Sequence, residues 1–379
     1  MMDRDNFEKL MTEVKDFVNN KVRPFAGKFE EEEAVPLSLI KEMAERKYLA
    51  APFPAEIGGL ELDQVQYGLL THEIGKGCPS VRALLTVHTS LVGQTLLRMA
   101  NQEQKDKWLP LLAKGEKIAA FGLTEPDVGT DAKSVQTRYE KQGDHFVITG
   151  RKKWITYGHL ADVFVIIARN EENVSAFLVE RDRENLRTTP IKGLLASRAA
   201  YIAEIELNAV RVPEENVIGN LGQGFSYIVN TALDYGRYSI AWAGVSLAEA
   251  ALEEMVKYAR NRSQFGQKLY KFQLIHEMIA NAVTKVQTAK SICLQAGEQR
   301  NNNADEAIMT TTIAKYYSSK IAMEVATDAV QLHGGNGCCN QYPVERLFRE
   351  AKIFEIIEGT SQIQQEIISM YGLKKYNRK

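Results

Sequence analysis

Glu358 lies at a point in the sequence where a carboxylate could act as a general base. It stands before Gly359, Thr360 and Ser361, and isoleucines at positions 363, 367 and 368 follow at helical spacing. A helix capped by Thr360 or Ser361 should therefore begin directly after it. The apolar residues over 353–357 predict that Glu358 lies in an apolar wall and points into a cavity. The loss of hydration there would raise the pKa of Glu358. The turn amides would be free to bind an oxyanion or a phosphate. The simpler alternative is a Glu that complements a helix dipole.

Composition excludes several classes of protein. The chain has 379 residues, 45% hydrophobic and 25% charged, with a formal net charge of −1. This composition is typical of a globular protein. A net charge near zero gives no sign of a basic surface that would bind nucleic acid or an anionic membrane. No apolar run approaches the ~20 residues of a membrane span, and the N-terminus has no secretion-signal pattern. Four cysteines form neither a disulfide framework nor a zinc pattern. A cytoplasmic protein without a metal is expected.

The apolar periodicity predicts a mostly α fold with a central β domain. Residues 1–117 read as helices, with His88 as a core histidine on the apolar face of the helix after Pro79. Residues 118–224 contain short β-type runs separated by turn signals, typical of a small barrel or sandwich. Residues 225–379 contain four long amphipathic segments, near 225–260, 272–300, 305–332 and 343–370, which suggest an antiparallel bundle. No Rossmann or P-loop motif is present.

The stretch Glu358-Gly-Thr-Ser resembles a signature of the acyl-CoA dehydrogenase family, and the resemblance covers nearly the whole chain. It implies that family's N-terminal helical domain, middle β-barrel and C-terminal four-helix bundle. It also implies FAD as the cofactor. Two further signatures, FGLTEPDVGTD at 121–131 and Trp154-Ile-Thr156, would lie against the flavin. The resemblance assigns to the flavin site the residues Phe121, Leu123, Thr124, Gly129, Thr130, Trp154, Ile155 and Thr156.

Two later stretches resemble family segments that reach the dinucleotide, one of them from a neighbouring subunit. Arg262, Gln264, Phe265 and Gln273 belong to the first, and the Arg262 guanidinium suits a pyrophosphate. Gln331, Gly334 and Gly335 belong to the second. Thr360, Ser361 and Gln362 would complete the cofactor site. A homodimer or homotetramer follows from this sharing, although an interhelical loop with one solvated Arg is the simpler alternative.

The resemblance makes Glu358 the catalytic base that removes the α-proton of an acyl thioester. Some members carry that Glu on an earlier helix, at the position that is Gly236 here. The backbone N–H of Glu358 and a flavin ribityl hydroxyl would hold the enolate oxygen. The predicted substrate-binding residues are Thr130, Asp234, Arg237, Glu358 and Gly359, while a surface ion pair remains the alternative for Asp234 and Arg237.

Several positions depart from the usual pattern of the family: Ala200, Ile202, Cys338, Cys339, Ile357 and Gln365. With these departures the chain looks most like the branch that oxidises acyl groups on an acyl carrier protein in polyketide extender-unit biosynthesis, of the hydroxymalonyl or methoxymalonyl type. The alternative is a short-chain acyl-CoA dehydrogenase of catabolism. An acyl-CoA oxidase and a flavin-bearing nucleic-acid-binding relative are further alternatives. The resemblance implies electron-transfer flavoprotein as the electron acceptor.

Overall fold

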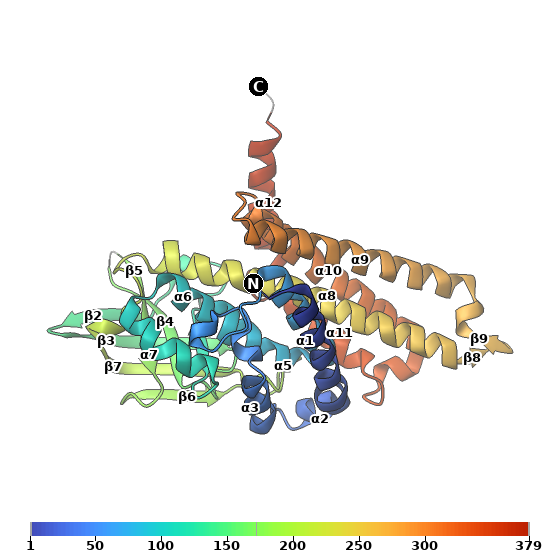
Figure 1. The fold of residues 1–379 in the computed structure, drawn as a ribbon, viewed down its shortest axis with the longest axis horizontal. Coiled ribbons are helices and arrows are strands. Elements are labelled where there is room, and N and C mark those ends of the chain that lie inside the picture. The colour runs from blue at the N-terminus through green and yellow to red at the C-terminus, as the bar shows by residue number, and fades with distance from the viewer. Residues whose placement is uncertain (1, 172, 378–379) are drawn as a thin grey trace.

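The computed structural model describes residues 2–171 and 173–377, and it begins with a layer of helices (Figure 1). Polar N-caps start three of them, and the predicted capping box of Asn101 and Gln104 is present. His88 is buried and accepts a hydrogen bond from the Ala119 N–H, as expected of a core histidine. The helices are α1 Arg4–Phe17, α2 Ala26–Glu31, α3 Leu37–Glu45, α4 Gln64–Gly77, α5 Pro79–Leu84, α6 Gln94–Met99 and α7 Gln102–Ala113, with a π-helical segment η5 Leu85–Gly93 between α5 and α6.

The middle of the chain forms one seven-stranded sheet with the order β1-β4-β2-β3-β7-β6, in which β5 also pairs with β4. Five strands coincide with the β-type runs seen in the sequence. The short strands β1 and β6 were not predicted. The strands are β1 Ala119–Gly122, β2 Arg138–Gln142, β3 His145–Ile155, β4 Val163–Arg169, β5 Val174–Glu180, β6 Leu186–Pro190 and β7 Ala203–Pro213.

Long helices build the last part of the chain and confirm the predicted fold class. They are α8 Asn230–Asn261, α9 Gln273–Asn301, α10 Ala307–His333, α11 Val344–Phe354 and α12 Ser361–Lys375, with a hairpin of β8 Ser263–Gln264 and β9 Gln267–Lys268 after α8. The predicted helical segment over 343–370 is two helices rather than one, and the helix start predicted after Glu358 is present with Thr360 as its N-cap. The chain breaks between α11 and α12, and α12 projects away from the body (Figure 1). Glu358 and Gly359 both have left-handed φ values, +54° and +94°, and therefore cannot continue a helix.

Helix α8 connects the two hydrophobic cores of the molecule. Ala232, near its start, belongs to the core shared by the N-terminal helices and the sheet, and Tyr238 begins the core of the C-terminal helices. Gly236 lies between them. The break between α11 and α12 reaches α8 at this junction, so side chains from all three parts of the fold can meet there. None of the described helices is long and apolar enough to cross a bilayer.

Candidate active site

The turn that carries Glu358 is fixed by three side chains from three helices. Arg237 Nε of α8 donates to the Glu358 carbonyl at 3.3 Å. Lys315 Nζ of α10 donates to the Gly359 carbonyl at 2.6 Å. Gln364 Nε2 of α12 donates to both carbonyls, at 3.2 and 3.1 Å. These bonds offset the cost of a left-handed Glu, which is about 1–3 kcal/mol. The orientation of Glu358 is thus determined by the bundle.

Glu358 is half-buried as a residue, and one oxygen of its carboxylate is shielded from water. Its Oε2 is buried, and no hydrogen-bond donor reaches it among residues 2–171 and 173–377. Burial raises the pKa of Glu358 to about 7, while the positive charges of Arg237 and Lys315 act in the opposite direction. The predicted rise in pKa therefore agrees with the structure. A group that titrates near 7 can be a carboxylate at neutral pH and still be basic enough to accept a proton.

The wall around this carboxylate differs from the prediction. Ile356, expected to line it, is 51% exposed. The carboxylate instead abuts Gly236 of α8: a Cβ there would lie 2.5 Å from Glu358 Oε2 and 2.8 Å from Leu91 Cδ2. Leu91 belongs to η5, so the N-terminal helices supply the apolar contact. The reason is the left-handed turn, which directs Glu358 away from its own helix and toward α8.

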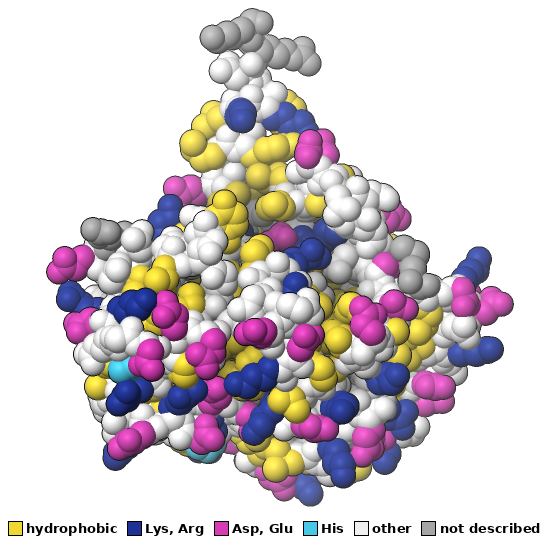
Figure 2. Space-filling view, turned by 60° about the vertical axis from the view of Figure 1, so that its left-hand side comes forward, with side chains coloured by type: hydrophobic (Ala, Val, Ile, Leu, Met, Phe, Trp, Pro, Cys, Tyr) yellow, Lys and Arg dark blue, Asp and Glu magenta, His cyan; other side chains and the backbone are white. Residues whose placement is uncertain are grey.

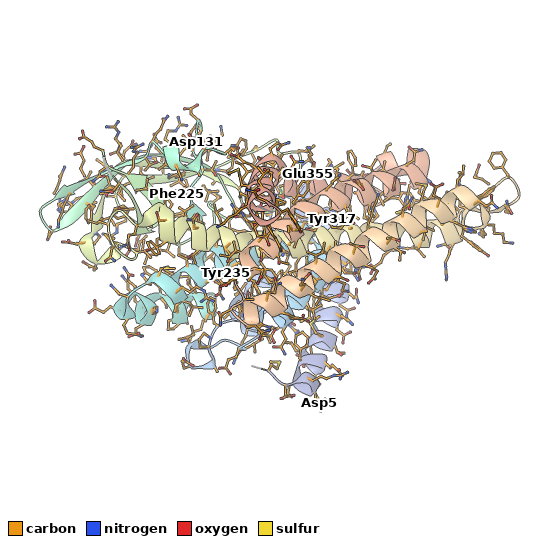
Figure 3. All side chains as sticks on the ribbon, turned by 90° about the horizontal axis from the view of Figure 1, so that it is seen from above. Asp5, Asp131, Phe225, Tyr235, Tyr317 and Glu355 are labelled. Carbon is orange, nitrogen blue, oxygen red and sulfur yellow. The ribbon has the colours of Figure 1, made fainter. Side chains whose placement is uncertain are left out.

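The start of α12 leaves fewer backbone donors free than predicted, since the Ser361 N–H donates to the Glu355 carbonyl at 2.9 Å. Thr360 is the N-cap, and its hydroxyl accepts from the Ile363 N–H at 3.4 Å. Within the described part of the chain, no group accepts a hydrogen bond from the Glu358 N–H. That amide is available to a carbonyl oxygen of a bound substrate. Figure 3 shows the neighbouring Glu355 in the middle of the molecule, between the β domain, which carries Asp131, and the long helices.

The segment 121–131 is held by a buried ion pair that the sequence analysis missed. Lys152 Nζ, fully buried in β3, donates to Glu125 Oε1 at 2.6 Å and to the Leu123 carbonyl at 3.1 Å. Glu125 also accepts from the backbone N–H groups of Gln136 and Thr137. Thr124 lies between these anchors, half-buried, and its carbonyl accepts from the Lys153 N–H. Thr124 can therefore present its hydroxyl at a fixed position.

Trp154 is turned out of the sheet next to this segment. The pairing of β3 with β7 is irregular between Lys152 and Ile155, and Trp154 has φ +63°. A bulge of this kind redirects one side chain. The indole is 51% exposed while Ile155 is buried, and Thr156 is half-buried beside them. An exposed indole on a strained bulge fits a planar ligand that would cover it.

The predicted cofactor residues around the β8–β9 hairpin lie at the other end of α8 from the Glu358 turn. Arg262, Gln264, Phe265 and Gln273 are exposed around the β8–β9 hairpin. Asn336 Nδ2 donates to Tyr258 OH, which brings Gly334 and Gly335 to that same end. Helix α8 has 32 residues and is about 48 Å long, with Gly236 near its start and Arg262 directly after its end. The two groups of residues cannot touch the same end of one cofactor within a single chain.

The structure separates Asp234 from Arg237. Asp234 forms a two-pronged ion pair with Arg300 of α9, at 3.0 and 2.7 Å, so the predicted alternative of a surface pair with Arg237 was wrong. Arg237 faces the Glu358 turn instead. Thr130 and Gln362 are exposed, and Ser361 is half-buried at the start of α12.

Two of the three side chains that hold the Glu358 turn, Lys315 and Gln364, were not identified from the sequence. A signal for Lys315 existed: it shares an apolar helical face with Ala314, Ser318 and Ala322, all buried. A lysine on such a face needs a partner. The sequence alone could not show that this partner is the Gly359 carbonyl.

The comparisons with known proteins agree with this geometry. The acyl-CoA dehydrogenase N-terminal, middle and C-terminal domains match residues 4–116, 120–210 and 222–373. A short-chain-specific acyl-CoA dehydrogenase of Clostridium acetobutylicum is 38% identical over 94% of this chain and 95% of its own length. A chain from the structure of the electron transferring flavoprotein of Acidaminococcus fermentans has a TM-score of 0.95 and 33% identity, covering 99% of this chain and 100% of that one.

A structural relative from secondary metabolism also matches. FkbI, which serves the biosynthesis of the methoxymalonyl extender unit of a polyketide immunosuppressant, has a TM-score of 0.88 and 29% identity, covering 96% of this chain and 99% of its own. The three domain matches together cover most of the chain. This chain belongs to the acyl-CoA dehydrogenase family.

Proposed function

We propose that this protein is a dehydrogenase of short-chain acyl-CoA thioesters in which Glu358 removes the α-proton. Members of the family are FAD-dependent oxidoreductases that act on CH–CH groups. The observation that carries the proposal is the Glu358 carboxylate, whose Oε2 is buried and unpaired among the described residues and abuts Gly236. A base fixed in this way can meet an α-carbon without reorganisation.

The chain offers matching groups for the cofactor and the thioester. The exposed indole of Trp154 would cover one face of the flavin, and Thr124 and Thr156 would donate to its edge. The flavin, when bound, accepts the hydride that leaves the β-carbon. The free N–H of Glu358 would bind the thioester carbonyl and stabilise the negative charge that develops there when Glu358 takes the proton.

The assembly we propose is a homodimer or a homotetramer. The exposed residues Arg262 and Phe265, the latter 94% exposed, would complete the FAD site of a second copy. Met370, Leu373 and Tyr376 are also exposed on α12, and Figure 2 shows hydrophobic side chains along this projection. Such apolar surface is characteristic of a protein interface. Electron-transfer flavoprotein is the proposed electron acceptor.

An acyl carrier protein as the acyl donor is a second candidate, supported by the similarity to FkbI. The relatives named above favour CoA, since the C. acetobutylicum enzyme is 38% identical to this chain and FkbI is 29% identical. The structure also weakens one argument for the carrier. Ala200 is fully buried and its carbonyl accepts from the Tyr157 N–H, so this substitution does not change the surface that CoA would contact.

Anaerobic bleaching of the flavin tests the function. FAD-loaded protein should be reduced by butyryl-CoA, and Glu358→Gln should retain FAD but react at least about 10²-fold more slowly. Near-normal bleaching of the variant would place the base elsewhere. The same acyl group on CoA and on an acyl carrier protein decides between the two donors: the larger kcat/KM identifies the physiological carrier.

A further inference from the structure

A carboxylate of α11 that the proposed mechanism does not use is buried against a loop of the β domain. Glu350 is 2% exposed. Its Oε1 accepts a hydrogen bond from the Ser197 N–H at 2.7 Å, and its Oε2 accepts one from the Ser197 hydroxyl at 2.9 Å. Burial raises the pKa of Glu350 to about 7, while the two bonds from Ser197 act in the opposite direction. Because burying an acid is costly, this contact calls for a reason.

The arginines next to Glu350 do not form ion pairs with it. Arg346 and Arg349 of α11 both pair with Glu30 of α2, and no ion pair within 2–171 and 173–377 includes Glu350. Among the described residues, the Glu350 carboxylate therefore bonds to Ser197 alone, whose backbone is left-handed with φ +55°. A serine persists in this conformation only where its surroundings fix it. The two bonds to Glu350 provide that constraint.

The loop that contains Ser197 supports the backbone next to the proposed flavin site. This loop, residues 191–202, joins β6 to β7. The Ser197 carbonyl accepts from the Ala200 N–H at 3.0 Å, and the Ala200 carbonyl accepts from the Tyr157 N–H at 2.8 Å. Tyr157 is fully buried, has φ +56° and directly follows the segment 154–156. Two hydrogen bonds therefore connect Ser197 to the residue after the segment that would contact the flavin.

The helix that carries Glu350 leads to the proposed catalytic base. Glu350 lies eight residues before Glu358, and the chain after α11 folds into a turn that is closed by the bond from the Ser361 N–H to the Glu355 carbonyl. The three side chains that hold the Glu358 turn all come from the C-terminal helices. None of their bonds relates the turn to the β domain, whereas the contact between Glu350 and Ser197 does.

We propose that Glu350 is a positioning residue which, through Ser197, sets the separation between the Glu358 carboxylate and the flavin site at Trp154. The base and the flavin site belong to different parts of the fold, and the reaction removes a proton and a hydride from neighbouring carbons of one acyl group. Both must therefore be aligned with the same substrate, and a misplacement of about 1 Å costs on the order of 10²-fold in rate. This inference rests on the proposed function and adds a residue to it.

Substitutions at the two residues test the inference in the FAD-loaded protein. Glu350→Leu removes both acceptors and should bleach with butyryl-CoA about 10²-fold more slowly than the wild type. Glu350→Gln keeps an acceptor for the Ser197 N–H and should stay within about threefold of the wild type. Ser197→Ala loses only the hydroxyl bond and should fall between these two variants. Lys352→Leu, which changes an exposed residue of the same helix, is the control.

Exchange of α-protons separates a loss of alignment from a loss of the base. Acetyl-CoA has α-protons but no β-carbon, so its proton exchange in D2O reports the action of Glu358 without hydride transfer. The three side chains that hold the Glu358 turn are unchanged in Glu350→Leu. This variant should therefore exchange the protons of acetyl-CoA within about threefold of the wild-type rate while its bleaching by butyryl-CoA is slow.

The two measurements also distinguish the possible failures. Equal losses of bleaching and exchange would assign Glu350 to the base or to the fold, and unchanged bleaching would show that the contact sets no distance; either result overturns the inference. Glu350→Gln as slow as Glu350→Leu would overturn it as well. If Glu350→Leu does not retain FAD, Ser197→Ala decides by the same comparison, and only slower bleaching with unchanged exchange supports the inference. A wild type that neither bleaches nor exchanges overturns the proposed function itself.

Discussion

Gly236 of α8 and Glu358, in the turn before α12, occupy complementary positions although they are far apart in the sequence. The carboxylate of Glu358 fills the space that a side chain at 236 would need, since a Cβ there would lie 2.5 Å from Oε2. The same family places its catalytic Glu at either of these positions, according to the resemblance seen in the sequence. The geometry gives a physical reason for this choice: the two positions face one volume, and only one of them can hold a carboxylate.

Gly236→Ala should therefore impair catalysis while leaving the fold intact. The added methyl group displaces the Glu358 carboxylate, and a misplacement of about 1 Å costs on the order of 10²-fold in rate. Anaerobic bleaching measures this loss, and the FAD content should be unchanged. Gly372→Ala is the matched control, because α12 has open space at that position. Equal activity of the two variants would show that the Glu358 side chain has room to move.

The pH dependence of the free enzyme should follow the titration of Glu358. Burial raises the pKa of this group to about 7, and only the carboxylate can accept a proton. We expect kcat/KM for an uncharged acyl chain to fall roughly tenfold per pH unit below 7 and to reach a plateau above it. A flat profile between pH 5.5 and 8 would contradict both the burial of Glu358 and its role as the base.

Lys315 should act on the reaction as a positioning residue. It lies close enough to lower the pKa of Glu358 by its charge, and it holds the Gly359 carbonyl. In Lys315→Met, the inflection of the pH profile should move to a higher pH, and the rate at neutral pH should fall by about tenfold or more. Lys320→Met, an exposed lysine on the same helix, is the control. A purely structural role of Lys315 would lower Tm without moving the inflection.

The ion pair of Lys152 and Glu125 should be essential to the structure of the segment 121–131, which we expect to bind the flavin. Lys152→Met leaves Glu125 buried without its cation, and breaking a buried pair in this way typically costs about 3–5 kcal/mol. We expect a lower free energy of unfolding and weaker FAD binding. Adding Glu125→Gln should recover part of the stability, because the uncompensated charge is then gone. Denaturant unfolding of the two single variants and the double variant measures the coupling.

The sequence predicted the helices and strands better than it predicted the contacts between their side chains. Helical periodicity and caps identified the long helices, and Asn101 with Gln104 defined the start of α7, because these signals are local. The Gly-Thr-Ser motif after Glu358 predicted the start of α12, but not the left-handed backbone of Glu358, because a non-glycine residue with positive φ carries no local signature. The partners of Asp234 and Lys315 could not be predicted either. Each lies on another helix, and only the packing of the bundle brings them together.

The last prediction concerns the distance between the two groups of cofactor residues. Helix α8 places Arg262 about 39 Å from Gly236, so the guanidinium does not reach the Glu358 turn of its own chain. If Arg262 binds the FAD of a second copy, Arg262→Ala should weaken FAD binding by about 10-fold or more, as expected for lost charge-assisted bonds. Lys271→Ala, an exposed cation beyond the same hairpin, provides a control for charge alone.

Mixed assemblies test whether this contact crosses between chains. Arg262→Ala and Glu358→Gln should each be nearly inactive at limiting FAD. In a hybrid, the Arg262→Ala chain keeps its Glu358 and receives an intact Arg262 from the other chain, which restores one of the two sites. Random dimerisation of equal amounts would therefore return about a quarter of the wild-type activity, given two-fold symmetric exchange. Arg262 acting within its own chain predicts no recovery, since every site would then lack either the base or the guanidinium. Activity that stays at the level of the unmixed variants after unfolding and joint refolding would thus exclude a shared site.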